Sequence, residues 1–182
     1  MKHGKVSEVE GVRVTKVNST SDNRGTFLKF HPAQEFEGDL DSIALSINPL
    51  LGTIRGLHFQ VEPFAEEKLV TCISGAIFDV IVDLRPSSRT FGNWQSFELS
   101  AENAMQAYLP RGVAHGFQTL MPNSIIHYSL TSIYSPTSSF SIDPFGDLGI
   151  DWPLNARSIA ERDVRGISFS FAAKKYADSI ES

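Results

Sequence analysis

The stretch GTIRGLHFQ, residues 52–60, places an arginine and a histidine inside a short apolar run. His58 has the chemistry of a general base, because imidazole gains and loses a proton near neutral pH. Removing a proton beside a substrate carbonyl also needs a cation or donor that stabilises the resulting enolate. Arg55 lies shortly before His58, and Lys68 begins the next apolar run. These residue types point to proton transfer at a carbon next to a carbonyl group.

His58 has a second chemical interpretation, as one ligand of a metal ion. Gly52 and His58 have the spacing of the first motif of cupin barrels, and PRGVAH, ending at His115, matches the second motif. The first motif normally contains a second histidine two positions on, where this chain has Gln60. A transition-metal site in such a barrel needs three or four His and carboxylate ligands. His58 and His115 are too few, so the sequence predicts a reaction without metal.

Arg55 and His58 are three positions apart, so in a regular strand their side chains point to opposite faces. A bulge or bend is needed to turn both toward one cavity, and Gly56 between them is the natural place for it. Without such an irregularity, His58 is a structural histidine in an apolar strand. That is the alternative interpretation of this residue.

Short apolar or alternating runs of strand length dominate the rest of the chain. They are rich in Val, Ile, Phe and Thr and are bounded by Gly, Pro, Asn or Ser. They lie at 12–17, 26–30, 42–48, 54–60, 68–74, 76–84, 94–100, 106–110, 115–120 and 124–134. This recurrence predicts one all-β domain, residues 1–182, built as an antiparallel barrel or sandwich. Helical signals are few: a short turn after Pro32 and an amphipathic helix at 171–180.

The run AIFDVIVDL, residues 76–84, shows the clearest alternation. Ile77, Asp79, Ile81 and Asp83 share one face of the predicted strand. Solvated or ion-paired structural roles are expected for the two aspartates rather than catalytic ones.

Composition excludes several classes of protein. A net charge of −5 does not supply the basic surface that binding to nucleic acid or an anionic membrane requires. Cys72 is the only cysteine, so no disulfide forms within the chain and a reducing compartment is favoured. No apolar stretch is long enough to span a membrane, and the first residues lack the pattern of a signal peptide. A cytoplasmic protein is expected.

Five motifs resemble one protein family, and they occur in the family's order between Arg24 and Asp163. These motifs are GTIRGLHFQ, FDVIVDLR, LSAEN, PRGVAHGF and LGIDWP. The chain thereby resembles the dTDP-4-dehydrorhamnose 3,5-epimerases. The resemblance implies a cupin-type jelly-roll barrel with a few short peripheral helices, and a homodimer. It also implies action on a nucleotide-diphosphate sugar, with a 4-keto-6-deoxy sugar unit, without metal or cofactor.

The resemblance assigns catalytic roles to four matching residues. His58 is the expected base that removes a proton next to the C4 ketone, and Asp163 pairs with this histidine and orients it. Tyr128 returns a proton on the opposite face of the sugar. Lys68 stabilises the enolate. Substrate contacts are implied for a further set of residues: Arg24, Arg55, Gln60, His115, Tyr134 and Arg162. In the family the residue that matches Arg24 often reaches the nucleotide across the dimer interface.

The part of the pattern that seats the nucleotide departs from the family. Lys29 and Ser139 stand where glutamates are usual, and Ala44 and Ser46 replace a polar Gln-x-Asn pair. The motifs therefore predict the reaction class but not the nucleotide, the sugar, or whether one carbon or two are inverted.

Other functions remain open at this stage. A nucleotide-sugar 3,4-ketoisomerase shares the barrel and the proton transfer but moves the carbonyl group. A non-catalytic carbohydrate-binding barrel is the second alternative. Structural roles also remain open for single residues: His115 could close a turn, and Tyr128 could be a core aromatic. Asp163 could belong to a helix N-terminus capped by Ser158.

Overall fold

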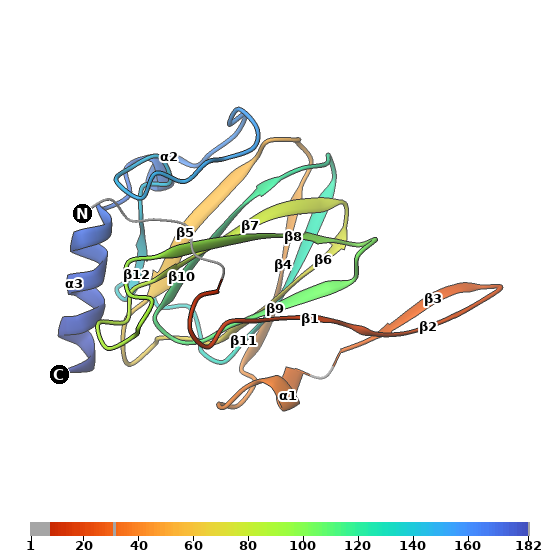
Figure 1. Ribbon diagram of the computed structural model, residues 1–182, viewed down its shortest axis with the longest axis horizontal. Coiled ribbons are helices and arrows are strands. Elements are labelled where there is room, and N and C mark those ends of the chain that lie inside the picture. The colour runs from red at the N-terminus through yellow and green to blue at the C-terminus, as the bar shows by residue number, and fades with distance from the viewer. Residues whose placement is uncertain (1–7, 31, 182) are drawn as a thin grey trace.

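Two five-stranded antiparallel sheets face each other in the computed structural model, which describes residues 8–30 and 32–181 (Figure 1). The first sheet has the order β1 (Arg13–Lys16), β9 (Met105–Leu109), β6 (Lys68–Ser74), β11 (Ser124–Leu130) and β4 (Ser42–Asn48). The second has the order β12 (Ser139–Ser141), β5 (Ile54–Gln60), β10 (Val113–Thr119), β7 (Ala76–Asp83) and β8 (Trp94–Ser100). Most neighbouring strands are distant in sequence, as in a jelly roll. The predicted fold class is confirmed.

Two strands, β2 and β12, were not predicted from the sequence. β2 (Asn18–Asp22) forms a hairpin with β3 (Gly25–Lys29), and this hairpin projects away from both sheets (Figure 1). β2 reads NSTSD and is exposed along its whole length, so it has no apolar alternation to reveal it. β12 has three residues, which is too short for a periodic signal.

Three short helices complete the fold. They are α1 (Pro32–Glu35), α2 (Glu161–Val164) and α3 (Phe169–Ile180). Ser168 caps α3, since its side chain accepts a hydrogen bond from the Phe171 amide at 3.3 Å, and the helix begins two residues before the predicted start. Among the described residues, no helix is both long and apolar enough to cross a membrane.

The core has two parts, one on each face of β7. Ile77 and Ile81 pack between the two sheets, in a cluster that also contains Phe117. Val80 and Val82 belong to a second cluster, to which the inner side of α3 contributes. The alternation at 76–84 therefore separates two buried faces rather than a buried face and a solvated one. Both faces of the second sheet are fixed by packing, so the strands that carry the site residues have little freedom to shift.

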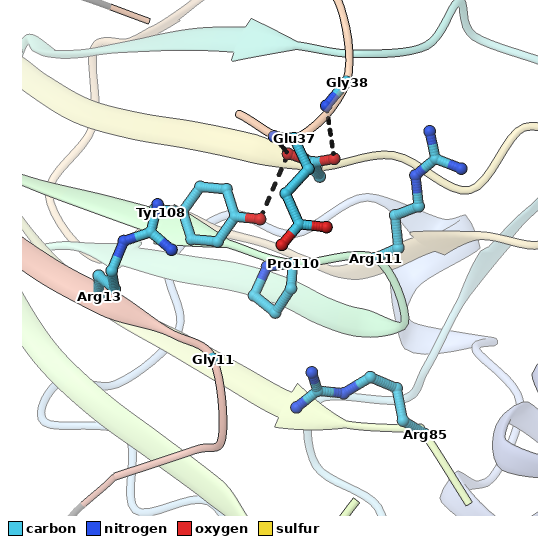
Figure 2. Close-up of a pocket in the computed structure, with 9 residues that line it drawn as sticks. Gly11, Arg13, Glu37, Gly38, Arg85, Tyr108, Pro110 and Arg111 are labelled. Carbon is cyan, nitrogen blue, oxygen red and sulfur yellow. Dashed lines mark hydrogen bonds between the residues drawn. The ribbon is translucent and has the colours of Figure 1, made fainter. Parts of the chain in front are cut away.

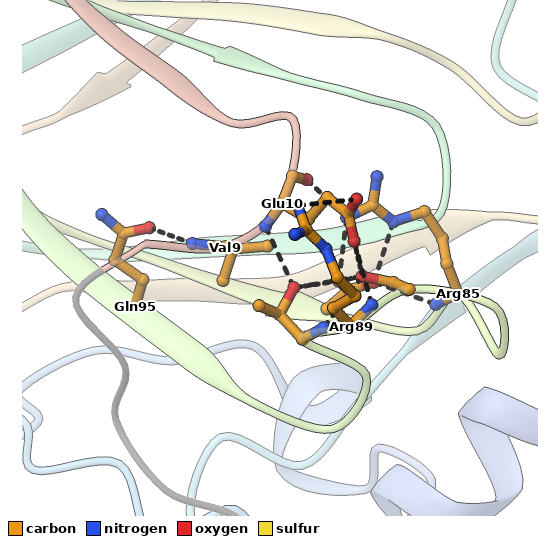
Figure 3. A network of polar contacts seen from close by, with 8 residues as sticks. Val9, Glu10, Arg85, Arg89 and Gln95 are labelled. Atoms are coloured by element: carbon orange, nitrogen blue, oxygen red, sulfur yellow. Dashed lines mark hydrogen bonds and ion pairs between the residues drawn. The ribbon is translucent and has the colours of Figure 1, made fainter.

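Asp83 belongs to a polar network that fastens the N-terminal segment to the β7–β8 loop (Figure 3). Its buried carboxylate accepts hydrogen bonds from Arg85 at 2.8 Å and Thr90 at 2.7 Å. Glu10 accepts from Ser88 at 3.1 Å and from the Arg89 amide at 2.9 Å. The ion-paired structural role expected for Asp83 is confirmed.

Candidate active site

A bulge in β5 allows the side chains of Arg55 and His58, which are three positions apart, to face the same cavity. His115 of β10 pairs with His58, but two residues further along β10 Phe117 pairs with Arg55, so β5 has one extra residue in this interval. Gly56 occupies the bulge with φ +107°, and a Cβ there would lie 2.6 Å from the Gly116 Cα. Only glycine fits this position, because both its dihedral angle and its close neighbour exclude a side chain. The predicted irregularity exists, and both side chains line one cavity.

The same bulge helps to hold a histidine–aspartate pair. His58 Nε2 lies 2.7 Å from Asp163 Oδ1, while Asp163 Oδ2 accepts from the Gly56 amide at 3.2 Å. Ser141 of β12, which pairs with His58 across the sheet, donates to Asp163 at 2.8 Å. Asp163 lies in α2 and is buried, not in a surface loop. Ser158 does not cap this helix, whose N-cap is Ala160 with no side-chain cap.

The electrostatics of this pair suit a base. Burial opposes ionisation of Asp163, but the hydrogen bonds from His58, Gly56 and Ser141 outweigh it and hold its pKa at about 2. An ionised Asp163 can only accept, so His58 Nε2 donates to it and the other ring nitrogen keeps its lone pair. Burial also lowers the pKa of His58, although Asp163 opposes this shift. His58 is therefore neutral and able to take up a proton at neutral pH.

Tyr128 and Lys68 occupy the wall opposite His58. Both belong to the first sheet, in β11 and β6, whereas His58 belongs to the second. All three line two connected parts of one cavity, an outer part of about 340 Å³ and an inner part of about 230 Å³. Burial, followed by the negative charge of Asp79, raises the pKa of Tyr128, which keeps its phenol protonated. The cavity thus has a neutral base on one wall and a proton donor on the other.

The inner part of the cavity holds a second histidine–aspartate pair. His115 Nε2 lies 2.7 Å from Asp79 Oδ1, and both side chains are buried. Asp79 Oδ2 has no hydrogen-bond partner among the described residues. Burial raises the pKa of Asp79, against the effect of His115. Asp79 thus has a partner inside the protein, and it stands directly behind a residue that lines the cavity.

The remaining predicted residues fall into three groups. Arg55 lines the inner part, where its Nε donates to Asn48 Oδ1 at 2.7 Å. Tyr134 and Arg162 line the outer part and are largely exposed. Arg24 lies on the projecting hairpin, where its side chain is 85% exposed and pairs with Asp22 at 2.6 Å. Within one protomer, Arg24 is not brought to the cavity.

Gln60 does not line the cavity. It is buried, and its amide nitrogen lies 3.0, 3.1 and 3.2 Å from Phe64 O, Ile133 O and a Glu66 carboxylate oxygen. The two hydrogens of the amide are shared among these three acceptors. Its carbonyl oxygen accepts from the Ser135 amide at 2.7 Å. These bonds use its hydrogen-bonding capacity inside the protein, so the geometry favours a structural role over the predicted substrate contact.

Sequence reasoning passed over three residues of this site. Ser141 and Asn48 hydrogen-bond to predicted site residues, and Glu66 lines the outer part of the cavity beside Lys68. Asn48 precedes a proline and looks like a turn residue, while Ser141 lies in the strand that was missed. Glu66 is one of two consecutive glutamates before Lys68, and the sequence alone does not say which of them faces inward.

The positions that depart from the family pattern mostly lie on the cavity walls. Ala44 and Ser139 line the outer part, and Ser46 lines the inner part. Lys29 ends β3 on the projecting hairpin. Three of the four departures therefore change the surface that a ligand in this cavity would contact.

A second cavity of about 570 Å³ lies apart from these residues (Figure 2). Its charged groups are mostly engaged with the protein: Arg13 stacks over the Tyr108 ring at 3.8 Å, and Glu67 accepts from Tyr108 at 3.2 Å. Arg85 is bonded to Asp83. This cavity lacks an arrangement of a base and an acid, so we do not assign the chemistry to it.

The described residues contain no group of three or more His, Cys, Asp or Glu side chains placed to hold a metal ion.

Comparison with known proteins gives a consistent result. The family model for dTDP-4-dehydrorhamnose 3,5-epimerase matches residues 6–170. The dTDP-4-dehydrorhamnose 3,5-epimerase of Sinorhizobium fredii is 40% identical over 167 residues, which cover 87% of this chain and 83% of that protein. The dTDP-4-dehydrorhamnose 3-epimerase of Streptomyces niveus is 33% identical over 162 residues, covering 85% and 78% of the two chains.

The fold has solved counterparts of the same kind. The crystal structure of dTDP-6-deoxy-D-glucose-3,5-epimerase from Legionella pneumophila, in complex with dTDP-4-keto-L-rhamnose, superposes with a TM-score of 0.82 at 32% identity. The superposition covers 91% of this chain and 92% of that chain.

Proposed function

Because this chain belongs to the dTDP-4-dehydrorhamnose 3,5-epimerase family, we propose that it inverts C3, C5 or both of a nucleotide-linked 4-keto-6-deoxy sugar. The observation that carries the proposal is the placement of His58 and Tyr128 on opposite sheets around one cavity, with Lys68 beside Tyr128. Inversion of a carbon requires a proton to leave one face and another to arrive at the opposite face. Two groups on opposite walls can do this, whereas one base cannot easily do both.

The proposed reaction proceeds through an enolate. His58 removes the proton from the carbon next to the C4 ketone, and the electron pair of that C–H bond moves toward the C4 oxygen. The Lys68 ammonium stabilises the negative charge that develops on this oxygen. Tyr128 then donates its phenolic proton to the same carbon from the other face, and the C4 ketone re-forms. Asp163 keeps the His58 ring oriented and stabilises its protonated state.

Solvent exchange tests this proposal directly. In deuterium oxide, the enzyme should introduce deuterium at C3, at C5 or at both when given a nucleotide-linked 4-keto-6-deoxyhexose. NMR of the product reports the position of the label. Absence of label at both carbons with several nucleotide sugars would sink the proposal.

The number of carbons inverted is decided by the same spectrum. Label at C3 alone describes a mono-epimerase, and the similarity to a 3-epimerase makes this outcome a specific candidate. Label at both carbons describes a 3,5-epimerase. A carbonyl group found at C3 of the product would instead indicate a 3,4-ketoisomerase.

We propose dTDP as the first nucleotide to test, because the relatives are named for dTDP-linked sugars. Ala44 and Ser139 alter the outer part of the cavity, so UDP, CDP and GDP belong in the same panel. A ligand that binds only the folded protein raises its Tm by mass action. The nucleotide with the largest shift identifies the natural carrier.

We also propose a homodimer formed through the outer face of the first sheet. Ile43, Leu45 and Ile47 of β4 form an exposed apolar row on this face, and Ile73 of β6, on the other side of β11, is also exposed. Exposed rows of large apolar side chains are typical of protein interfaces. A partner would also explain the projecting hairpin, which carries Arg24. Analytical ultracentrifugation of Leu45→Glu should show monomers where the parent protein shows dimers.

A further inference from the structure

Glu66 lines the proposed active site, but its carboxylate has no role in the proposed proton transfers. Its Oε1 lies 3.1 Å from Lys68 Nζ, and each side chain is only 10% exposed. Its Oε2 accepts a hydrogen bond from Gln60 Nε2 at 3.2 Å. One carboxylate oxygen thus faces the ammonium, and the other is anchored to the protein framework.

The anchor is rigid because Gln60 is itself held at several points. Gln60 bonds to Phe64 in the β5–β6 loop and to Ile133 and Ser135 in the segment after β11. These contacts fix the amide relative to both sheets. The carboxylate of Glu66 thus lies between this amide and the Lys68 ammonium.

Lys68 needs such a partner more than the other cations of the site. Its ammonium lies on a long flexible stem, and a buried ammonium without a counter-charge is strongly disfavoured. Arg55 has its Nε bonded to the neutral amide of Asn48, and Arg162 is largely exposed to water. Of these three cations, Lys68 alone combines a buried side chain with a carboxylate partner of its own, Glu66. The carboxylate near Arg162 is Asp163, which already pairs with His58.

We infer that Glu66 is a positioning residue for Lys68, holding its ammonium directed at the place where the C4 oxygen of the substrate lies. This inference takes its substrate from the proposed function and rests on it. It adds a residue that places Lys68 for the step in which the enolate is stabilised. Gln60 would then have a structural role in the site. It occupies the position of the second metal histidine of cupins, and it contacts the Glu66 carboxylate that holds Lys68.

A double-mutant cycle tests the inference by activity. Glu66→Gln should lower kcat about tenfold with little change in KM, and Lys68→Met about 100-fold, the size typical of losing one stabilising group. In the Lys68→Met background, Glu66→Gln should have no further effect or should restore some activity, because the carboxylate then only repels the enolate. A tenfold loss that persists in that background overturns the inference.

Glu67→Gln is the matched control. Glu67 is the neighbouring glutamate and is buried, but it lines the separate cavity, where it accepts hydrogen bonds from the Tyr108 hydroxyl and the amides of Glu37 and Gly38. This variant should lower Tm while leaving kcat unchanged. Glu66→Asp, which keeps the charge on a shorter stem, should recover part of the activity lost in Glu66→Gln.

A measurement without substrate separates this inference from the proposed function. The contact with Glu66 shields the Lys68 amine from reagents. Lys68 should therefore undergo reductive methylation slowly in the parent protein and in Glu67→Gln, and at least several-fold faster in Glu66→Gln. Peptide mass spectrometry quantifies the modification at Lys68. Equal rates in Glu66→Gln and the parent overturn the role of Glu66, whereas failure of solvent exchange in the parent overturns the epimerase proposal alone.

Discussion

The two histidine–aspartate pairs of this protein have the same separation and different surroundings. Nε2 to Oδ1 is 2.7 Å in both the His58–Asp163 and the His115–Asp79 pair. The His58 side chain is 32% exposed and that of His115 is 5% exposed. Asp163 receives additional hydrogen bonds from Gly56 and Ser141, while one oxygen of Asp79 has no partner among the described residues.

The difference shows that distance alone does not make a catalytic pair. Hydrogen bonds to Asp163 favour its ionised form and lower its pKa, whereas burial raises the pKa of Asp79. The first pair has a fixed charge behind a histidine that reaches the substrate space. The second pair is placed to shape the inner wall, with a histidine that can hold the sugar.

Replacing the two histidines should give the largest contrast. His58→Asn removes the proposed base and should reduce solvent exchange by about 1000-fold or more, within the range of general base catalysis. His115→Asn should reduce kcat/KM by a much smaller factor, mainly through KM. Deuterium exchange followed by NMR measures both. Equal losses in the two variants would contradict the separation of roles.

Tyr128→Phe should give the next largest effect. The variant lacks the proton donor on the second wall but keeps His58, so epimerisation should fall about 100-fold while exchange at the same carbon falls less. Comparing the rate of deuterium wash-in with the rate of product formation gives this split. If both rates fall together, Tyr128 acts on binding or on enolate formation instead.

Replacing the two aspartates should separate the pairs in stability. Asp163→Asn should cost about 2 kcal/mol at pH 7, because a pKa of about 2 in place of 3.8 stabilises the folded state. That stabilisation is present above pH 3.8 and is lost as the pH falls from 3.8 toward 2. Asp79→Asn should leave stability unchanged or raise it, since burial opposes ionisation of Asp79. Urea unfolding at pH 7 and pH 3 measures both variants.

The pH profile should give the smallest effect. His58 works as a base in its neutral form, and its pKa is lowered from the ordinary 6.5. The acid limb of kcat/KM should therefore fall at a pH below 6.5, so that activity is retained under mildly acidic conditions. A limb above 6.5 would mean that Asp163 outweighs burial at this histidine.

Much of the site was predictable because its signals are local in sequence. GTIRGLHFQ contains the proposed base His58, the arginine Arg55 and the bulge glycine Gly56 within nine residues, and the alternation of the other runs predicts which side chains face inward. Asp79 shows the limit of such patterns. Its position in an apolar strand was visible, but its partner His115 is on another strand, and only the contact between them explains why a carboxyl group is buried there.

Gln60 and Glu66 also show that a local sequence pattern does not reveal which partners a side chain has in the folded chain. Gln60 was expected to contact substrate because it occupies a motif position, yet it hydrogen-bonds to loops that meet only in the folded chain. The two consecutive glutamates before Lys68 look alike in sequence. One lines the proposed active site and the other a separate cavity, because neighbouring side chains of an extended segment point to opposite sides.

The sequence by itself determined the class of fold, the proposed reaction class and the residue proposed as the base, since strand periodicity and the RGLH motif depend on neighbouring residues. The tertiary structure decided which polar groups are paired, which are buried and which walls face each other. Those properties arise from residues distant in the chain, and no local pattern encodes the solvation that separates the proposed catalytic partner Asp163 from the buried Asp79.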